Sequence, residues 1–217
     1  KDYKVFITKF KDSFESILNK ENIVPVKKGI ANVNYVVCDT TGLTTSGIMS
    51  DEEFFTFTDL EEVYLPLPVL RTNKSFNRFL KYYAKDDLTF TVDDLHAMIE
   101  NEQFQDWLKI QENNNKFLNF LLEKELLEDF LDEPIFIEHE CGSLYSAEDL
   151  YYDIDEHLTD LGAFSNHICY ISFNTREYFK DNSNWTDVVD GKFNSFDPFS
   201  FVKDTLLSRK NKPDTIK

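Results

Sequence analysis

The chain has 217 residues, of which 41% are hydrophobic, 23 are basic and 40 are acidic, giving a formal net charge of −17. This hydrophobic content is enough for a packed core and excludes a disordered chain, while the acidic balance disfavours direct binding of a phosphate backbone. No apolar run approaches the roughly 20 residues that span a bilayer, so we expect no membrane segment.

Cysteine usage predicts a reducing compartment. The three cysteines, Cys38, Cys141 and Cys169, are odd in number and show no paired spacing, which is typical of thiols rather than disulfides. We therefore expect a cytoplasmic protein. The sequence begins with Lys1 rather than Met, so we also expect a processed product or a fragment of a longer chain.

The first half of the chain predicts helices that alternate with short extended segments. Apolar residues recur at helical spacing over residues 3–18, whereas residues 23–26, a turn at Gly29 and residues 33–38 indicate two short strands. Ser50 before three acidic residues predicts one helix start, and Thr91 with Asp94 forms a capping-box pattern for another. The predicted buried positions on the helices are Phe54, Phe55, Phe57, Phe76, Phe79, Leu80, Tyr83, Leu95, Met98 and Ile99.

The second half begins with a long helical pattern over residues 104–131, with a predicted break at residues 113–115. A strand over 135–137 and a turn at Gly142 follow, and then Ser146 with Asp149 predicts a short helix over residues 146–152. The remaining predictions are a strand over 168–172, two closing helices over 185–189 and 199–207, and a polar tail over 208–217 that frays.

The same order of elements occurs twice along the chain. Each copy reads as an edge strand, a glycine turn and a short element ending in Tyr, followed by helices. We therefore predict a helix-rich α+β fold with two similar units, each a small sheet covered by helices. The predicted division is residues 1–123 and 124–217, with the joint near residues 112–132.

Two patterns invite a catalytic or metal-binding interpretation. His139 and Cys141 flank Glu140, and His157 and His167 lie downstream. Zinc sites usually have two short-spaced ligand pairs, and only one pair is present here. No local nucleophile signature surrounds Cys141. We therefore expect no metal, no cofactor and no catalytic residue among them.

The acidic clusters fit structural roles better than catalytic ones. Carboxylates gather at residues 51–53, 59–62, 93–94 and 153–160, and helix starts and solvated faces explain most such runs. A phosphate-binding loop is not indicated, because Gly42 and Gly47 lack the lysine of that motif. The sequence predicts a protein that is not an enzyme.

Several short motifs resemble a known family. Leu-Tyr-Ser-Ala-Glu-Asp-Leu-Tyr at 144–151, Ile-Ser at 171–172 and Trp185 with a Phe-rich stretch after it resemble repeated regions of large bacterial sacsin-like proteins. Segments 39–43, 48–53 and 64–70 carry the weaker first copy. Those proteins have an N-terminal gyrase- or chaperone-type ATPase domain, but Asp-Thr-Thr-Gly at 39–42 lacks the second glycine of its ATP site. The resemblance therefore implies a non-catalytic middle or tail segment used as interaction or regulatory scaffolding.

A protein partner is the predicted ligand. Tyr145, Leu150, Tyr151 and Tyr152 form an aromatic stretch on an acidic background, which suits a partner with a basic, partly apolar patch. Alternatively, these tyrosines fill the core. A second functional hypothesis is a free-standing inhibitor, an immunity protein or nucleic-acid mimic, that occupies the basic site of a toxin or nuclease. Such a mimic needs one continuous acidic face, whereas the acidic runs here are far apart in sequence.

Overall fold

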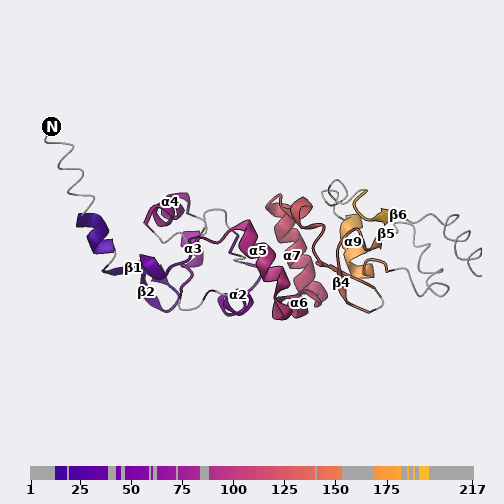
Figure 1. Ribbon diagram of the computed structural model, residues 1–217, viewed down its shortest axis with the longest axis horizontal. Helices are drawn as coiled ribbons and strands as arrows, with labels where there is room; N and C mark the ends of the chain where they lie inside the picture. Colours follow the sequence, from indigo (N-terminus) through magenta and orange to yellow (C-terminus); the bar gives the residue numbers. More distant parts are fainter. Residues whose placement is uncertain are drawn as a thin grey trace, which may run out of the picture. The chain divides into compact units, whose positions relative to one another are not determined.

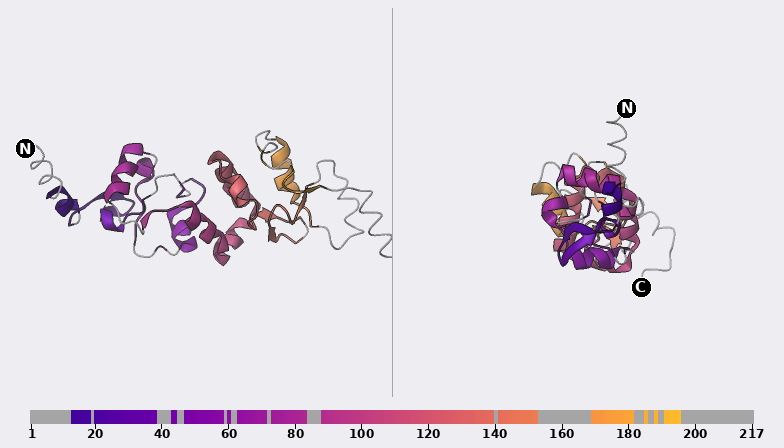
Figure 2. Two further views of the ribbon diagram at one scale, coloured as in Figure 1. Left: turned by 45° about the horizontal axis from the view of Figure 1, so that its top comes forward. Right: turned by 90° about the vertical axis from the view of Figure 1, so that its left-hand side faces the viewer.

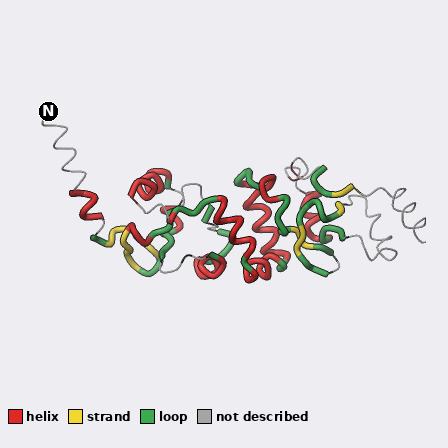
Figure 3. Tube along the Cα trace, viewed as in Figure 1, coloured by secondary structure: helices red, strands yellow, loops and turns green. Residues whose placement is uncertain are grey.

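The computed structural model describes residues 13–18, 20–38, 43–44, 47–58, 60, 63–71, 73–83, 88–139, 141–152, 169–181, 185, 188 and 191–195. It shows a helix-rich α+β chain with short strands (Figure 3). The chain divides into two compact units, Lys1–Phe104 and Gln105–Lys217, whose residues can be followed by colour in Figure 1. This confirms the predicted fold class.

A β-hairpin begins the sheet of the first unit. Strand β1 (Asn22–Val26) pairs antiparallel with β2 (Gly29–Asn32) across the predicted turn. Gly29 has φ of 136°, a conformation that favours glycine because it has no Cβ. Isolated bridges continue the pairing: Val26 with Pro66 (antiparallel), Val36 with Tyr64 (parallel) and Cys38 with Thr89 (parallel). The hairpin is thus a two-stranded sheet, and single bridges link its neighbourhood to residues 64, 66 and 89.

The described part of the first unit contains several helices besides the hairpin. They are η1 (Val33–Tyr35), α2 (Asp51–Phe57), α3 (Pro68–Arg71), α4 (Lys74–Tyr83) and α5 (Val92–Glu100), with a further helical stretch at residues 13–18 (Figure 2). Leu80 of α4 is fully buried against Val24, Ala31 and Val36, and Phe76, Phe79 and Tyr83 pack around it. The predicted face of α4 is thus the one that it buries.

The second unit has the same kinds of element. Helix α6 (Glu102–Leu108) crosses the division between the units, and α7 (Gln111–Glu123), η3 (Leu127–Phe130) and α9 (Phe173–Asp181) follow. Strand β3 (Phe136–Ile137) pairs antiparallel with β4 (Leu144–Tyr145), and β5 (Tyr151–Tyr152) pairs parallel with β6 (Asn194–Ser195). Isolated bridges join Glu138 with Ile171 (antiparallel) and Tyr151 with Tyr170 (parallel).

The two units share one pairing order. In each, the first hairpin strand contacts a later segment antiparallel, and that segment pairs parallel with the stretch that follows the hairpin. The later segment leads directly into a helix, α3 in one unit and α9 in the other. Even single hydrogen bonds correspond: Leu67 N–H donates to Pro25 O (3.2 Å), and Ser172 N–H donates to Ile137 O (2.7 Å). This shared order agrees with two similar units, and their similarity stays a prediction.

The boundary between the units differs from the predicted one at residue 123. Helix α7 belongs to the second unit, because its side chains bond to later segments of the chain. Asn114 Nδ2 donates to Ile135 O (2.7 Å), and Gln111 Nε2 donates to Thr175 Oγ1 (2.8 Å). The division therefore falls before α7, at Phe104.

Three predicted elements are wrong in detail. The stretch 33–38 begins with η1 rather than a strand, because the Asn32 side chain caps that turn by accepting from Asn34 N–H (3.0 Å). The break expected at 113–115 lies instead between α6 and α7. The predicted helix 146–152 is a turn followed by β5, because Tyr151 N–H donates to Cys169 O (3.0 Å).

Other predictions fall partly or wholly outside the described residues. These are residues 3–12 of the helix predicted over 3–18, the acidic run 153–160, most of the helix 185–189, the helix 199–207 and the tail 208–217.

Candidate functional site

Tyr145 lies half-buried on β4, with Phe136 opposite it on β3. Its hydroxyl forms a hydrogen bond with the Cys169 thiol and lies within electrostatic reach of Cys141. The pKa of Tyr145 is raised above its ordinary value, chiefly because ionised Cys169, and then Cys141, would disfavour a phenolate beside it. The neighbouring thiols thus make it harder for the Tyr145 phenol to lose its proton.

Tyr152 is part of the core of the second unit. Its ring lies 6.1 Å from that of Phe179 and 5.8 Å from that of Phe193, measured between centroids. Burial raises the pKa of Tyr152, opposed by Arg176 and aided by Glu177. A serine in place of this tyrosine would leave a cavity among aromatic rings. Tyr152 therefore stabilises the fold, although part of its side chain is exposed.

The predicted partner surface loses one member outright. Leu150 is 0% exposed and therefore cannot contact a partner in this fold. Tyr145 and Tyr151 are half-buried on neighbouring segments of the same unit and keep part of their surface accessible. The predicted surface is reduced to these two residues and the outer side of Tyr152.

His139 and Cys141, the two of these candidates that the structure describes, each have a contact of their own. The His139 ring stacks on Tyr170 at 4.7 Å, and Cys141 N–H donates to the carboxylate of Glu138 (2.6 Å). Among the described residues, no three His, Cys, Asp or Glu side chains gather in an arrangement that could hold a metal ion. His157 and His167 lie outside the described residues.

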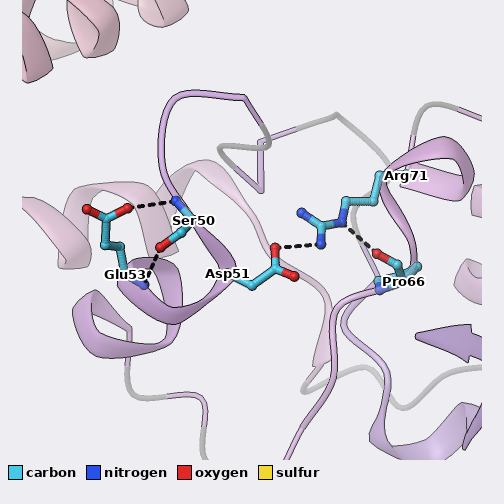
Figure 4. Close-up of polar contacts among 5 residues, drawn as sticks. All are labelled: Ser50, Asp51, Glu53, Pro66 and Arg71. Atoms are coloured by element: carbon cyan, nitrogen blue, oxygen red, sulfur yellow. Dashed lines mark hydrogen bonds and ion pairs between the residues drawn. The ribbon is translucent and has the colours of Figure 1, made fainter. Parts of the chain in front are cut away.

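The acidic residues at the described helix starts have structural roles. The Glu53 carboxylate accepts from Ser50 N–H (2.7 Å) while Ser50 Oγ accepts from Glu53 N–H (3.2 Å), a complete capping box (Figure 4). Asp94 caps α5 with Thr91 in the same way. Asp51 instead pairs with buried Arg71. These carboxylates are occupied within their own fold.

A cavity of about 360 Å³ lies in the first unit, between α2 and α5. Phe57, Phe90 and Met98 form apolar parts of its wall, and Asp94, Glu100 and Asn101 supply polar groups. The carboxylate of Asp94 already accepts from Thr91 N–H and Oγ1, each at 2.7 Å. Of these polar groups, the Asp94 carboxylate is therefore already committed to the start of α5.

The outer face of the β1–β2 hairpin is the apolar surface that the sequence prediction missed. Ile23 is 40% and Ile30 59% exposed, and Pro25, directly opposite Ile30 in the register, is exposed as well. The sequence does not show which side chains of β1 are exposed, because its buried and exposed residues are equally apolar. Lys27 and Lys28 are exposed at the turn beside this face.

The chain matches no family model, no curated protein and no solved structure. Among the described residues, no helix has both the length and the apolar character that crossing a bilayer requires.

Proposed function

We propose that this chain is a non-catalytic, protein-binding segment of a larger polypeptide, and that its main docking face is the outer side of the β1–β2 hairpin. The observation that carries the proposal is the exposure of Ile23, Pro25 and Ile30 together on one face. The relation to sacsin-like proteins stays a prediction, and the docking face stands independently of it.

The register explains why Pro25 and Ile30 share a face, whereas Ile23 lies at an irregularity of the pairing between Asn22 and Val24 and is exposed beside them. Alternate residues of a strand point to opposite sides, and Val24, Val26 and Ala31 fill the core beneath. Pro25 and Ile30 are cross-strand partners, so their side chains are neighbours on the outside. Covering such apolar surface contributes about 25 cal/mol per Å² removed from water.

Charge indicates the kind of partner. Lys27 and Lys28 place two positive charges at the turn beside the apolar face, on a chain whose net charge is −17. A partner segment that alternates acidic and apolar side chains would complement both features. The partner expected for the hairpin face is therefore acidic, whereas the tyrosine stretch suggested a basic partner.

The inhibitor hypothesis receives less support from the described residues. Glu53 and Asp94 accept hydrogen bonds from the backbone at the starts of their own helices, and Asp51 pairs with Arg71. A mimic of nucleic acid uses carboxylates that are available to a partner. The hairpin face is therefore the better basis for a function.

Two synthetic peptides test the proposal, one alternating Glu and Val and the other alternating Lys and Val. We expect the acidic peptide to bind in a fluorescence-anisotropy titration and the basic one not to. The variant Ile30→Ser should weaken binding about tenfold or more, because Ile30 lies at the centre of the face. Val69→Ser is the matched control, since Val69 is 72% exposed on α3 and outside the face. Binding that Ile30→Ser leaves unchanged, or a preference for the basic peptide, would contradict the proposal.

A further inference from the structure

The cavity between α2 and α5 has an apolar floor and a polar edge. Its described lining includes the buried side chains of Phe57, Phe90 and Met98, whereas Ala97 and Glu100 are exposed. Its volume of about 360 Å³ lies at the lower end of the roughly 300–1,000 Å³ that is typical of small-molecule sites. The cavity can therefore cover the apolar part of a small molecule while one end of that molecule stays near water.

The spacing of residues along α5 explains this arrangement. Asp94, Ala97, Met98 and Asn101 follow one another at steps of three and four residues, so they form one stripe along the helix and its cap. The facing wall includes the C-terminal end of α2 with its cap Thr58. Both helices begin with complete capping boxes, so regular structure carries most of the described lining.

The charge around the cavity is negative. Asp94 and Glu100 supply two carboxylates, and none of the described lining residues is basic. The last turn of α2 also has no basic residue, and the C-terminal end of a helix carries a partial negative charge. A cation at the edge of the cavity would therefore be attracted by both carboxylates and by this helix end, whereas an anion would be repelled.

Glu100 is the carboxylate that is available to a ligand. It is exposed, and among the described residues it is not one that forms a hydrogen bond or an ion pair. By contrast, both hydrogen bonds to the Asp94 carboxylate end on Oδ2. Asn101 Oδ1 accepts from Gln103 N–H (2.9 Å) and Phe104 N–H (3.2 Å) at the start of α6. Asp94 and Asn101 thus hold the starts of helices, and Glu100 can pair with a ligand.

We propose that this cavity binds a small organic amine, with the apolar body of the amine against Phe57, Phe90 and Met98 and its ammonium group beside Glu100. The N–H groups of an ammonium donate to a carboxylate, and such charge-assisted hydrogen bonds are stronger than neutral ones. A neutral molecule of the same shape keeps the apolar contacts and loses this pairing. The site uses no residue of the β1–β2 face, so it stands independently of the function proposed above.

Three probes that share one phenyl body test the charge of the ligand: phenethylamine, phenethyl alcohol and phenylacetate. Each is titrated into the full chain, and binding is followed by the backbone amide shifts in two-dimensional NMR. We expect phenethylamine to shift the signals of Ala97 and Asn101 and to bind about threefold more tightly than the alcohol, with phenylacetate the weakest. Equal affinity of the amine and the alcohol, or shifts that leave both residues unchanged, would overturn the proposal.

Variants test the position of the ammonium group. Glu100→Gln removes one charge at constant size and should weaken amine binding about threefold, without changing the affinity for the alcohol. Glu52→Gln is the matched control, because Glu52 is exposed on α2 and does not line the cavity.

Ala97→Leu enlarges a side chain at the exposed edge and should weaken binding of both the amine and the alcohol, while circular dichroism shows an unchanged fold. The proposal fails if Glu100→Gln and Glu52→Gln affect amine binding equally, or if Ala97→Leu leaves that binding unchanged.

Discussion

Arg71 Nη2 lies 2.8 Å from Asp51 Oδ1 and joins the end of α3 to the first turn of α2 (Figure 4). The Arg71 side chain is only 5% exposed, and its Nε also donates to Pro66 O (2.7 Å). One guanidinium therefore satisfies a carboxylate and a buried carbonyl together. Because Pro66 also bridges Val26 of β1, this arginine ties two helices to the sheet.

Replacing Arg71 with alanine should lower the free energy of unfolding by about 3 kcal/mol, because it leaves Asp51 and Pro66 O without their donor. Urea unfolding followed by circular dichroism measures the change. Arg78→Ala is the control, since Arg78 is exposed on α4 and should change stability by less than about 0.5 kcal/mol. Equal effects of the two variants would show that the Arg71 contacts are not stabilising.

A second prediction concerns neighbouring asparagines on α7. Asn114 is 0% exposed and donates from Nδ2 to Ile135 O (2.7 Å), whereas Asn115 accepts at Oδ1 from Gln111 Nε2 (2.9 Å). Asn114→Asp replaces the donor by an acceptor facing a carbonyl, so we expect a loss of about 2–4 kcal/mol.

The matched control is Asn115→Asp, which keeps an acceptor where one is needed and should change stability by less than about 0.5 kcal/mol. Both variants are measured by the same urea titration. If the Asn115 variant were the more damaging of the two, the assigned side-chain hydrogen bonds would be wrong.

Gly29 should resist substitution more strongly than Gly191. Its φ of 136° lies outside the left-handed helical region, whereas Gly191 has φ of 74°, near it. No atom stands within 4 Å of a Cβ built at either position, so any difference reflects backbone strain. We expect Gly29→Ala to cost about 1–2 kcal/mol and Gly191→Ala less, by thermal unfolding.

The raised pKa of Tyr152 predicts that the folded chain loses stability at high pH. Burial raises its folded-state pKa above the unfolded value of 10.0, so the folded chain holds the phenolic proton more tightly. This contribution is fully present below pH 10 and is lost as the pH rises through the folded pKa. Stability of the native chain should therefore fall more steeply above pH 10 than that of Tyr152→Phe, and parallel curves would contradict the assignment.

The sequence predicted helix starts well where the following residues agree with the cap. Ser50 and Thr91 both open helices, and each is followed by apolar residues at helical spacing that the fold buries. Ser146 and Asp149 form the same local pair, with Ser146 Oγ donating to Asp149 Oδ2 (2.9 Å), but no helix follows. There Ala147 N–H donates to Leu131 O and Tyr151 joins a strand, so long-range pairing overrides the local pattern.

The candidate surfaces were less predictable for a different reason. Leu150 and Tyr152 are placed by contacts with residues distant in sequence, as in the packing of Tyr152 on Phe193, and no local pattern encodes that burial. The exposed hairpin face was hidden because Ile23 and Pro25 alternate with equally apolar Val24 and Val26. Only the pairing with β2 shows which set faces outward.

The division of the chain at Phe104 has a spectroscopic consequence. Both tryptophans of the sequence, Trp107 and Trp185, belong to the second unit, where they are 8% and 0% exposed. Emission excited selectively from indole therefore reports that unit alone, while the first contributes only tyrosine and phenylalanine signals. Comparing indole emission with the backbone signal along one denaturation curve will show whether the two units unfold together or one after the other.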